Sequence, residues 1–151
     1  MLTYGLMFRT LSFALAQTMN ETLSSLELTF SQGHILGYLA HCQTPPCAKD
    51  IEDRFQLSHP TVSGLLSRLE KKGFLSQQSD PQDRRRKLVV LLPKGRACTE
   101  AMSEVIRSGD ESLLQGFTPE EREQFRAYLI RAIHNVSPDH PIPFPKEEFP
   151  K

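Results

Sequence analysis

The sequence predicts a mainly α-helical protein with one small β-hairpin. Two short helical patterns flank a tight break at Leu57-Ser58, and helical spacing of apolar residues fills most of the remaining chain. Residues 74–78 and 86–92, directly after the second pattern, have the composition of strands. The segment Asp80-Pro81-Gln82-Asp83 joins them as a turn, because proline fixes φ and aspartate bonds to nearby backbone. Two helices and a hairpin in this order predict a winged helix-turn-helix.

Six helices are predicted, over residues 4–26, 29–42, 48–55, 58–72, 97–115 and 118–136. Thr29 and Thr118 each begin a helix, since a threonine followed three residues later by Gln or Glu forms a capping box. Residues 4–26 are apolar on more than one face, which suits a helix buried against a second subunit. Residues 137–151 contain five prolines and are predicted to form a tail without a core of its own.

Charge is distributed unevenly along the 151 residues. The 18 Lys and Arg residues balance the 18 Asp and Glu residues over the whole chain. Residues 47–96 hold eleven of the basic and six of the acidic residues, a net charge of +5, while the rest holds seven and twelve, a net charge of −5. A positive segment that coincides with the helix-turn-helix and hairpin favours double-stranded DNA as a partner.

The sequence lacks the motifs that would indicate an enzyme, a membrane protein or a secreted protein. Without a phosphate loop, a His-x-x-x-His pair or a nucleophile elbow, the chain is predicted to be no enzyme and to need no cofactor. No run approaches the roughly 18 apolar residues of a membrane span, and no signal-peptide cleavage pattern is present. Together with only three cysteines, this predicts a cytoplasmic protein with no membrane partner.

The helix over residues 58–72 is predicted to read DNA. Val62, Leu65, Leu66 and Leu69 form its apolar stripe, so the opposite face is small, polar and basic. Ser58 is predicted to cap this helix through the amide of Thr61. The candidate contacts to bases or phosphates are Ser58, His59, Pro60, Thr61, Ser63, Gly64, Ser67, Arg68 and Lys71. Arg68 could instead brace acidic neighbours, and His59 could be an ordinary surface residue.

The hairpin turn carries the second set of candidate contacts. Arg84, Arg85 and Arg86 follow Asp83 directly and precede Lys87. Four adjacent cations repel each other unless a polyanion is near, and an arginine at the tip of a wing can enter a minor groove. A solvated turn is the alternative interpretation of this cluster.

Residues 57–75, L-S-H-P-T-V-S-G-L-L-S-R-L-E-K-K-G-F-L, and residues 80–95, D-P-Q-D-R-R-R-K-L-V-V-L-L-P-K-G, closely resemble the MarR family of bacterial transcription regulators. The resemblance extends over residues 5–136. It rests on the R-L-E-x-K-G-F/L pattern at the end of the helix over residues 58–72 and on the D-x-x-D-x-R pattern of Asp80, Asp83 and Arg85. Leu92-Pro93 departs from the usual end of the second strand.

The resemblance implies a homodimer that reads a pseudo-palindromic operator through two winged lobes. Residues 1–28 and 96–136 would form the helical dimerisation region, residues 29–95 the DNA-binding lobe, and residues 137–151 a proline-rich tail. It further implies that Asp83 braces Arg85 by a salt bridge, while Arg84 and Arg86 take phosphates. A small-molecule effector is expected between the dimer helices and the lobe, with Phe13, His34 and Tyr38 as candidates, although core packing is the alternative for each.

The predicted function is therefore a sequence-specific, ligand-responsive transcriptional repressor. One alternative is a winged-helix interaction protein that antagonises another regulator without binding DNA. Another is a thiol-based redox regulator, because Cys42 and Cys47 lie on either side of a Pro-Pro turn and Cys47 is placed at the start of a helix. His34, His41 and Cys42 do not complete a metal site, so no metal is predicted.

Overall fold

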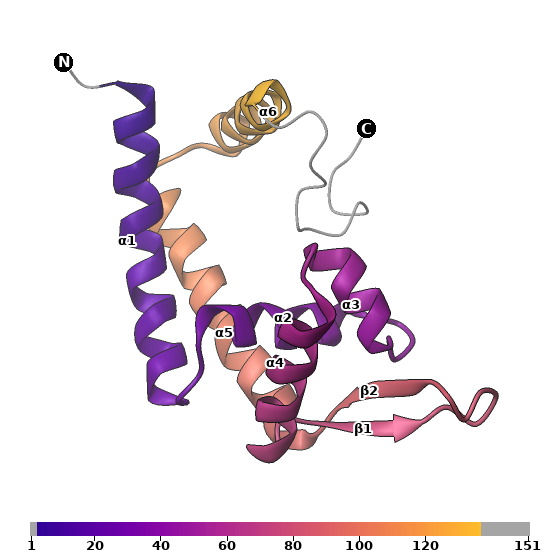
Figure 1. The fold of residues 1–151 in the computed structure, drawn as a ribbon. Coiled ribbons are helices and arrows are strands. Elements are labelled where there is room, and N and C mark those ends of the chain that lie inside the picture. Colours follow the sequence, from indigo (N-terminus) through magenta and orange to yellow (C-terminus); the bar gives the residue numbers. More distant parts are fainter. Residues whose placement is uncertain (1–2, 137–151) are drawn as a thin grey trace. The chain divides into compact units, whose positions relative to one another are not determined.

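The computed structural model describes residues 3–136 (Figure 1). The chain forms two compact units, residues 1–109 and residues 110–151. The elements are α1 (Tyr4–Ser25), α2 (Phe30–His41), α3 (Ala48–Phe55), α4 (His59–Lys71), β1 (Leu75–Ser79), β2 (Lys87–Leu91), α5 (Pro93–Leu113) and α6 (Pro119–Val136).

The core of the first unit lies between α2, α3, α4 and the hairpin, with the end of α1 and the first half of α5 packed against it. The predicted apolar stripe of α4 is buried, and Ile51 of α3 has no exposed surface. This packing fixes α4 with one face inward and the other free. The buried apolar residues are Leu23, Leu28, Ile35, Leu36, Leu39, Ile51, Val62, Leu65, Leu66, Leu69, Phe74, Leu75, Val89, Leu91, Cys98 and Met102.

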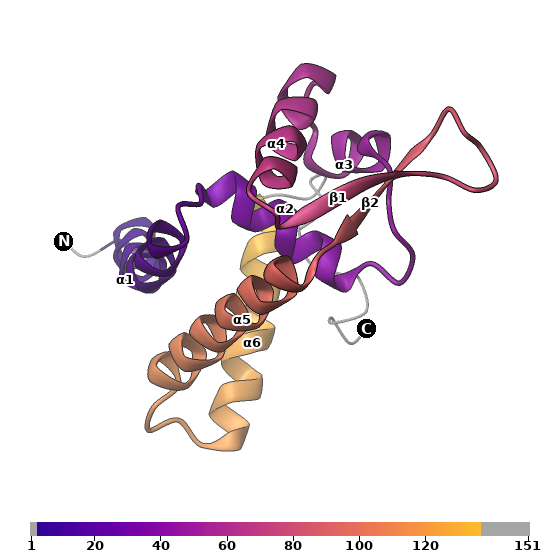
Figure 2. The same ribbon diagram turned by 90° about the horizontal axis from the view of Figure 1, so that it is seen from below.

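The wing is an antiparallel pair in which Leu75 faces Leu91 and Ser79 faces Lys87. The loop between the strands lies at the end of the hairpin that is farthest from α4 (Figure 2). A further segment joins the pair, because the amide of Val89 donates to the carbonyl of Pro46 at 2.7 Å and Cys47 forms a bridge with Leu88. The residues just before α3 are therefore fastened to β2.

Helix starts agree with the capping boxes. Gln32 N donates to Thr29 Oγ1 at 3.3 Å, while Thr29 N donates to Gln32 Oε1 at 2.9 Å. Thr118 and Glu121 make the same reciprocal pair at the start of α6. The predicted start of the fifth helix was wrong, since α5 begins at Pro93 and includes residue 95. Proline is well suited to a first helical position, where its missing N–H has no partner to lose.

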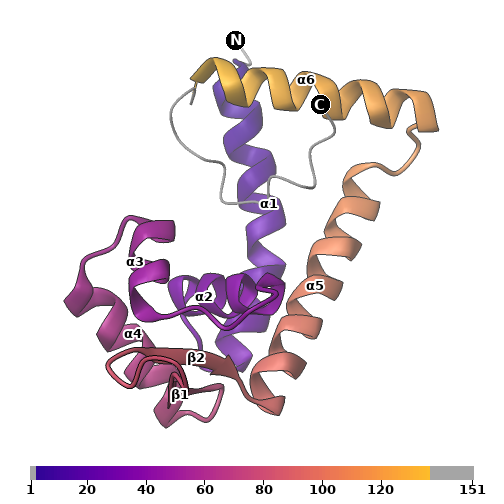
Figure 3. The same cartoon turned by 90° about the vertical axis from the view of Figure 1, so that its right-hand side faces the viewer.

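The two outer helices carry apolar side chains that their own unit leaves open. In α1 only Leu23 is buried, and the helix runs out from the core beyond its C-terminal part (Figures 1 and 3). Tyr4 and Phe13 on this helix are 78% and 74% exposed. In α6, whose residues 119–136 are all described, none is buried. Several large apolar side chains exposed on one helix, as on α1, are typical of a surface that a protein partner covers.

Candidate nucleic-acid interface

The outward face of α4 consists of short, polar and basic side chains. Of the nine residues predicted to contact DNA on this helix and its cap, eight are exposed and Gly64 is half-buried. A Cβ added at Gly64 would meet nothing closer than Arg68 Nη2, at 3.9 Å. The packing of the chain itself therefore does not require glycine here, and the helix backbone at Gly64 is open to close approach by a partner.

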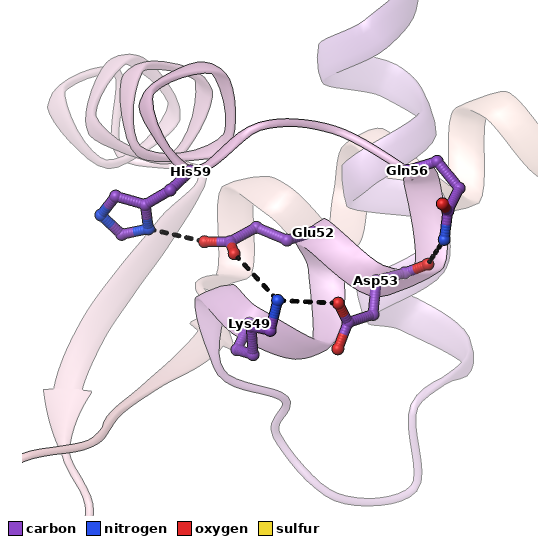
Figure 4. Close-up of polar contacts among 5 residues, drawn as sticks. All are labelled: Lys49, Glu52, Asp53, Gln56 and His59. Carbon is purple, nitrogen blue, oxygen red and sulfur yellow. Dashed lines mark hydrogen bonds and ion pairs between the residues drawn. The ribbon is translucent and has the colours of Figure 1, made fainter.

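The entry to α4 is tied to α3 by a histidine and a glutamate (Figure 4). His59 Nδ1 lies 2.6 Å from Glu52 Oε1. Lys49 Nζ lies 3.6 Å from Glu52 Oε2 and 2.9 Å from Asp53 Oδ1. The turn passes through Gln56, whose left-handed backbone (φ 53°, ψ 43°) allows the chain to reverse between the helices.

Ser58 does occupy the residue before α4, but its hydroxyl does not cap the helix amides. Ser58 Oγ and Thr61 Oγ1 share a hydrogen bond of 2.8 Å instead. At the other end of α4, Glu70 accepts from the amide of Gln77 at 2.7 Å and from its Nε2 at 3.0 Å. The helix is thus held against β1, and α4 and the wing form one continuous surface.

The aspartates of the wing act on the backbone. Asp80 Oδ1 accepts from the amide of Gln82 at 2.8 Å, and Asp83 Oδ1 accepts from the amide of Arg85 at 3.0 Å. The amide of Asp80 donates to the carbonyl of Arg86 at 2.9 Å and closes the loop. The salt bridge expected between Asp83 and Arg85 is not formed: no ion pair within residues 3–136 joins the Asp83 carboxylate to the Arg85 guanidinium. The Asp83 carboxylate instead accepts a hydrogen bond from a backbone amide of its own turn, which is a common role for aspartate in turns.

Arg86 is the wing arginine that is paired within the chain. Its Nη2 lies 3.0 Å from Asp50 Oδ2, and the amide of Cys47 donates to the same oxygen at 2.8 Å. The Cys47 amide, and to a lesser extent Arg86, lower the pKa of Asp50 against the effect of burial. This arrangement fastens the wing loop, at the point where it enters β2, to the first turn of α3, so the phosphate role predicted for Arg86 competes with an existing contact.

The remaining cations of this surface are open. Lys71, Arg84 and Arg85 lie on the surface with Arg68, and in the part of the chain that the structure describes they form no ion pair. Exposed cations without partners on adjacent elements make a surface complementary to a row of phosphates.

Known proteins share both this fold and much of this sequence. A family model described as MarR family matches residues 26–86. The structure of MepR from Staphylococcus aureus, a transcription regulator of the multidrug efflux pump MepA, is 34% identical, covers 89% of this chain and 99% of its own, and superposes with a TM-score of 0.74. A complex of the same S. aureus protein with DNA is 34% identical, covers 88% and 99%, and gives 0.72. The chain belongs to the MarR family.

MepR bound to ethidium bromide is similar over nearly the same range, with 34% identity, 89% and 97% coverage and a TM-score of 0.70. The MarR fold prediction, mainly α with a two-stranded wing after a helix-turn-helix, is confirmed. The family model ends at residue 86, inside the wing, so its match includes α4 and most of the basic turn.

The three residues predicted to bind an effector have different surroundings in the structure. Phe13 borders a depression of about 480 Å³ along the exposed side of α1, which includes neither His34 nor Tyr38. The ring of His34 lies 4.1 Å from that of Phe30, and partial burial lowers its pKa. Tyr38 packs edge-on against Phe55, and burial, helped by a hydrogen bond with Cys42, raises its pKa to about 12.

The cysteines of this MarR protein are all free thiols. Cys42 follows α2 directly, and burial raises its pKa, which disfavours the reactive thiolate. Cys47 precedes α3 and donates its amide to Asp50. Among the described residues no group of three or more His, Cys, Asp or Glu could hold a metal ion, and no helix there has the length and hydropathy to cross a bilayer.

Proposed function

We propose that this MarR family regulator binds a specific operator in double-stranded DNA through α4 and the wing, and thereby represses transcription. The single observation that carries the proposal is the open face of α4 together with Arg84 and Arg85 in the wing loop, which have no ion-pair partner among residues 3–136. An α-helix with short polar side chains fits the major groove, and a wing arginine fits the neighbouring minor groove. MepR, with 34% identity, has been seen bound to DNA.

The proposed DNA-binding form is a homodimer. Residues 1–28 and 96–136 would supply the interface, because α1 and α6 expose apolar side chains that a second copy would cover. The winged lobe, residues 29–95, would then be present twice and read a pseudo-palindrome whose half-sites lie about one helical turn apart. A location in the cytoplasm, beside the DNA, goes with this role, and we expect no enzymatic activity.

We also propose that a small molecule relieves repression. MepR bound to ethidium bromide is the support for an effector of this chain. The depression beside Phe13 is lined by α1 alone and contains neither His34 nor Tyr38, so we propose that a second subunit completes the effector pocket. The effector would act by favouring a dimer with a different separation of the two lobes.

Two alternatives remain distinguishable by experiment. A winged-helix antagonist would dimerise without binding DNA, but the open cations of α4 and the wing would then have no role. A redox regulator would need a reactive pair at Cys42 and Cys47, and the raised pKa of Cys42 argues against it.

The test is a DNA-binding measurement with purified full-length protein. Duplexes are first selected from a randomised pool, and the affinity of the selected duplex is then measured by fluorescence anisotropy over a series of salt concentrations. Arg85→Ala should weaken binding and reduce the slope of log affinity against log salt by about 0.9, the value for one phosphate contact. The matched control is Arg9→Ala, which removes the same charge from α1, outside the winged lobe; because α1 belongs to the proposed interface, the dimeric state of this variant is verified by size-exclusion chromatography. An unchanged affinity and slope in the Arg85 variant would contradict the proposal.

A further inference from the structure

His59 is the first residue of α4, and its side chain is 74% exposed although one ring nitrogen is held. Its Nδ1 lies 2.6 Å from Glu52 Oε1, on α3, and the carboxylate side chain of Glu52 is only 11% exposed. Figure 4 shows the second ring nitrogen on the side of the imidazole away from Glu52. One nitrogen is therefore engaged by the protein, while the other is available to a partner.

The identity of the partner atom decides which nitrogen carries the proton. An ionised carboxylate can only accept a hydrogen bond, so the hydrogen in the contact with Glu52 must be on Nδ1 of His59. A neutral imidazole has a single N–H, and Nε2 is then left with a free lone pair. In the neutral form of His59, Glu52 thus makes the exposed nitrogen a hydrogen-bond acceptor, whereas in the protonated ring both nitrogens would donate.

Glu52 is itself fixed in place. Lys49, one turn earlier on α3, lies 3.6 Å from its Oε2 and also contacts Asp53 at 2.9 Å. Burial and a neighbouring cation limit the rotamers that Glu52 can adopt, so the orientation of the His59 ring is limited with it.

His59 also lies where a base can reach it. The positions of His59, Ser63 and Ser67 differ by four residues each, and all three are exposed, so they form one row along the outward face of α4. In helix-turn-helix proteins the first residues of the second helix contact base edges. Serine hydroxyls both donate and accept, whereas the polarity of His59 is set by Glu52.

We propose that Glu52 is a positioning residue that makes His59 a specificity-determining residue. Through Nε2, His59 would accept a hydrogen bond from an exocyclic amine in the major groove, the N6 amine of adenine or the N4 amine of cytosine. This inference rests on the proposed function, because it assigns a base preference to a DNA-reading α4.

A purely electrostatic role and a positioning role predict different effects of neutralising Glu52 on DNA binding. A carboxylate near DNA repels phosphates, so its neutralisation should strengthen binding to all sequences. A positioning role predicts instead that Glu52→Gln loses discrimination, since a glutamine side chain can donate or accept and both tautomers of His59 become available. Asp53→Asn is the matched control. It removes the same charge from the same helix and weakens an ion pair with the same Lys49, but Asp53 does not contact His59.

The experiment compares duplexes selected from a randomised pool at mildly alkaline pH, which favours the neutral imidazole, by the full-length wild type, Glu52→Gln, His59→Ala and Asp53→Asn proteins. At one position of each half-site, we expect the duplexes selected by the wild type and by Asp53→Asn to carry mainly adenine or cytosine. That preference should fall roughly three- to tenfold in Glu52→Gln and His59→Ala, as for the loss of one hydrogen bond. If the wild type selects a sequence and Glu52→Gln selects it equally well, the inference is wrong while the proposed function stands. If the wild type selects no sequence, the proposed function fails, and the inference fails with it.

A spectroscopic measurement tests the tautomer without DNA. The chain has five histidines, and His59→Ala identifies the signals of His59 in long-range proton–nitrogen spectra of the ¹⁵N-labelled protein. At mildly alkaline pH the wild type and Asp53→Asn should show the proton on Nδ1, and Glu52→Gln should show a mixture. A proton on Nε2 in the neutral wild-type ring would overturn the inference.

Discussion

Asp50→Asn separates two roles for Arg86 by the sign of its effect on DNA affinity. Asp50 Oδ2 accepts both from the Cys47 amide, at 2.8 Å, and from Arg86 Nη2, at 3.0 Å. If Arg86 braces the wing, the neutral asparagine loosens the wing and DNA binding weakens. If Arg86 contacts a phosphate when DNA is bound, Asp50 competes with that phosphate, and its neutralisation strengthens binding.

The size of the effect follows from exposure. The side chains of Arg86 and Asp50 are 46% and 43% exposed, and ion pairs this open to solvent are weak. Asparagine can still accept from the Cys47 amide, so the first turn of α3 keeps its contact. We therefore expect a loss of roughly two- to fivefold in operator affinity and little change in the salt slope.

The assay is fluorescence anisotropy of the selected duplex at several salt concentrations with Asp50→Asn, Arg86→Ala and the double variant. Because each single substitution breaks the same pair, the double variant should bind about as well as either single one. Arg84→Ala is the comparison, since Arg84 has no ion-pair partner within residues 3–136 and should lower the salt slope. Tighter binding by Asp50→Asn, with a slope steeper by about 0.9, would refute the bracing role.

Three further predictions concern stability and redox chemistry. Gly95→Ala should lower the free energy of unfolding by about 1–3 kcal/mol in urea titrations, since its Cβ would lie 2.2 Å from the carbonyl oxygen of Phe74, whereas Gly37→Ala meets nothing within 4 Å and should not. The pKa of Asp50 is lowered in the fold, so its ionised form stabilises the protein above the unfolded pKa of about 3.9. This stability is lost as the pH falls through the folded pKa. In urea titrations at a series of acidic pH values, Asp50→Asn should therefore lose less stability than the wild type. Peroxide or diamide should leave operator affinity unchanged, because burial raises the pKa of Cys42, and a loss of affinity that a thiol reductant reverses would support the redox alternative.

Local chemistry made much of the fold predictable from sequence. The spacing of Val62, Leu66 and Leu69 determines which side of α4 is buried, and these residues have no exposed surface in the structure. The capping boxes at Thr29 and Thr118 depend on residues three positions apart, and both form. The exposed face of α4 follows directly from its buried one.

Contacts between distant or irregular segments were not predictable in this way. Asp50 and Arg86 are 36 residues apart, and they meet only because Pro46 pairs with β2. Glu52 and His59 are seven residues apart, but their contact depends on the left-handed turn at Gln56, for which the sequence carries no glycine signal. In each case the sequence indicates the helices correctly and leaves the side-chain partners open.

The absence of buried residues among residues 119–136 has a consequence for the protein in the cell. A helix of this length without a fully buried residue gains limited stability from packing within its own chain, and isolated helices of similar length are marginal in water. In the proposed homodimer, α6 is stabilised by association, so its order depends on the amount of protein present. A newly synthesised chain that has not met a second copy would expose α6 to proteases. Degradation would then remove unpaired chains selectively, and the cellular level of the regulator would follow its capacity to assemble.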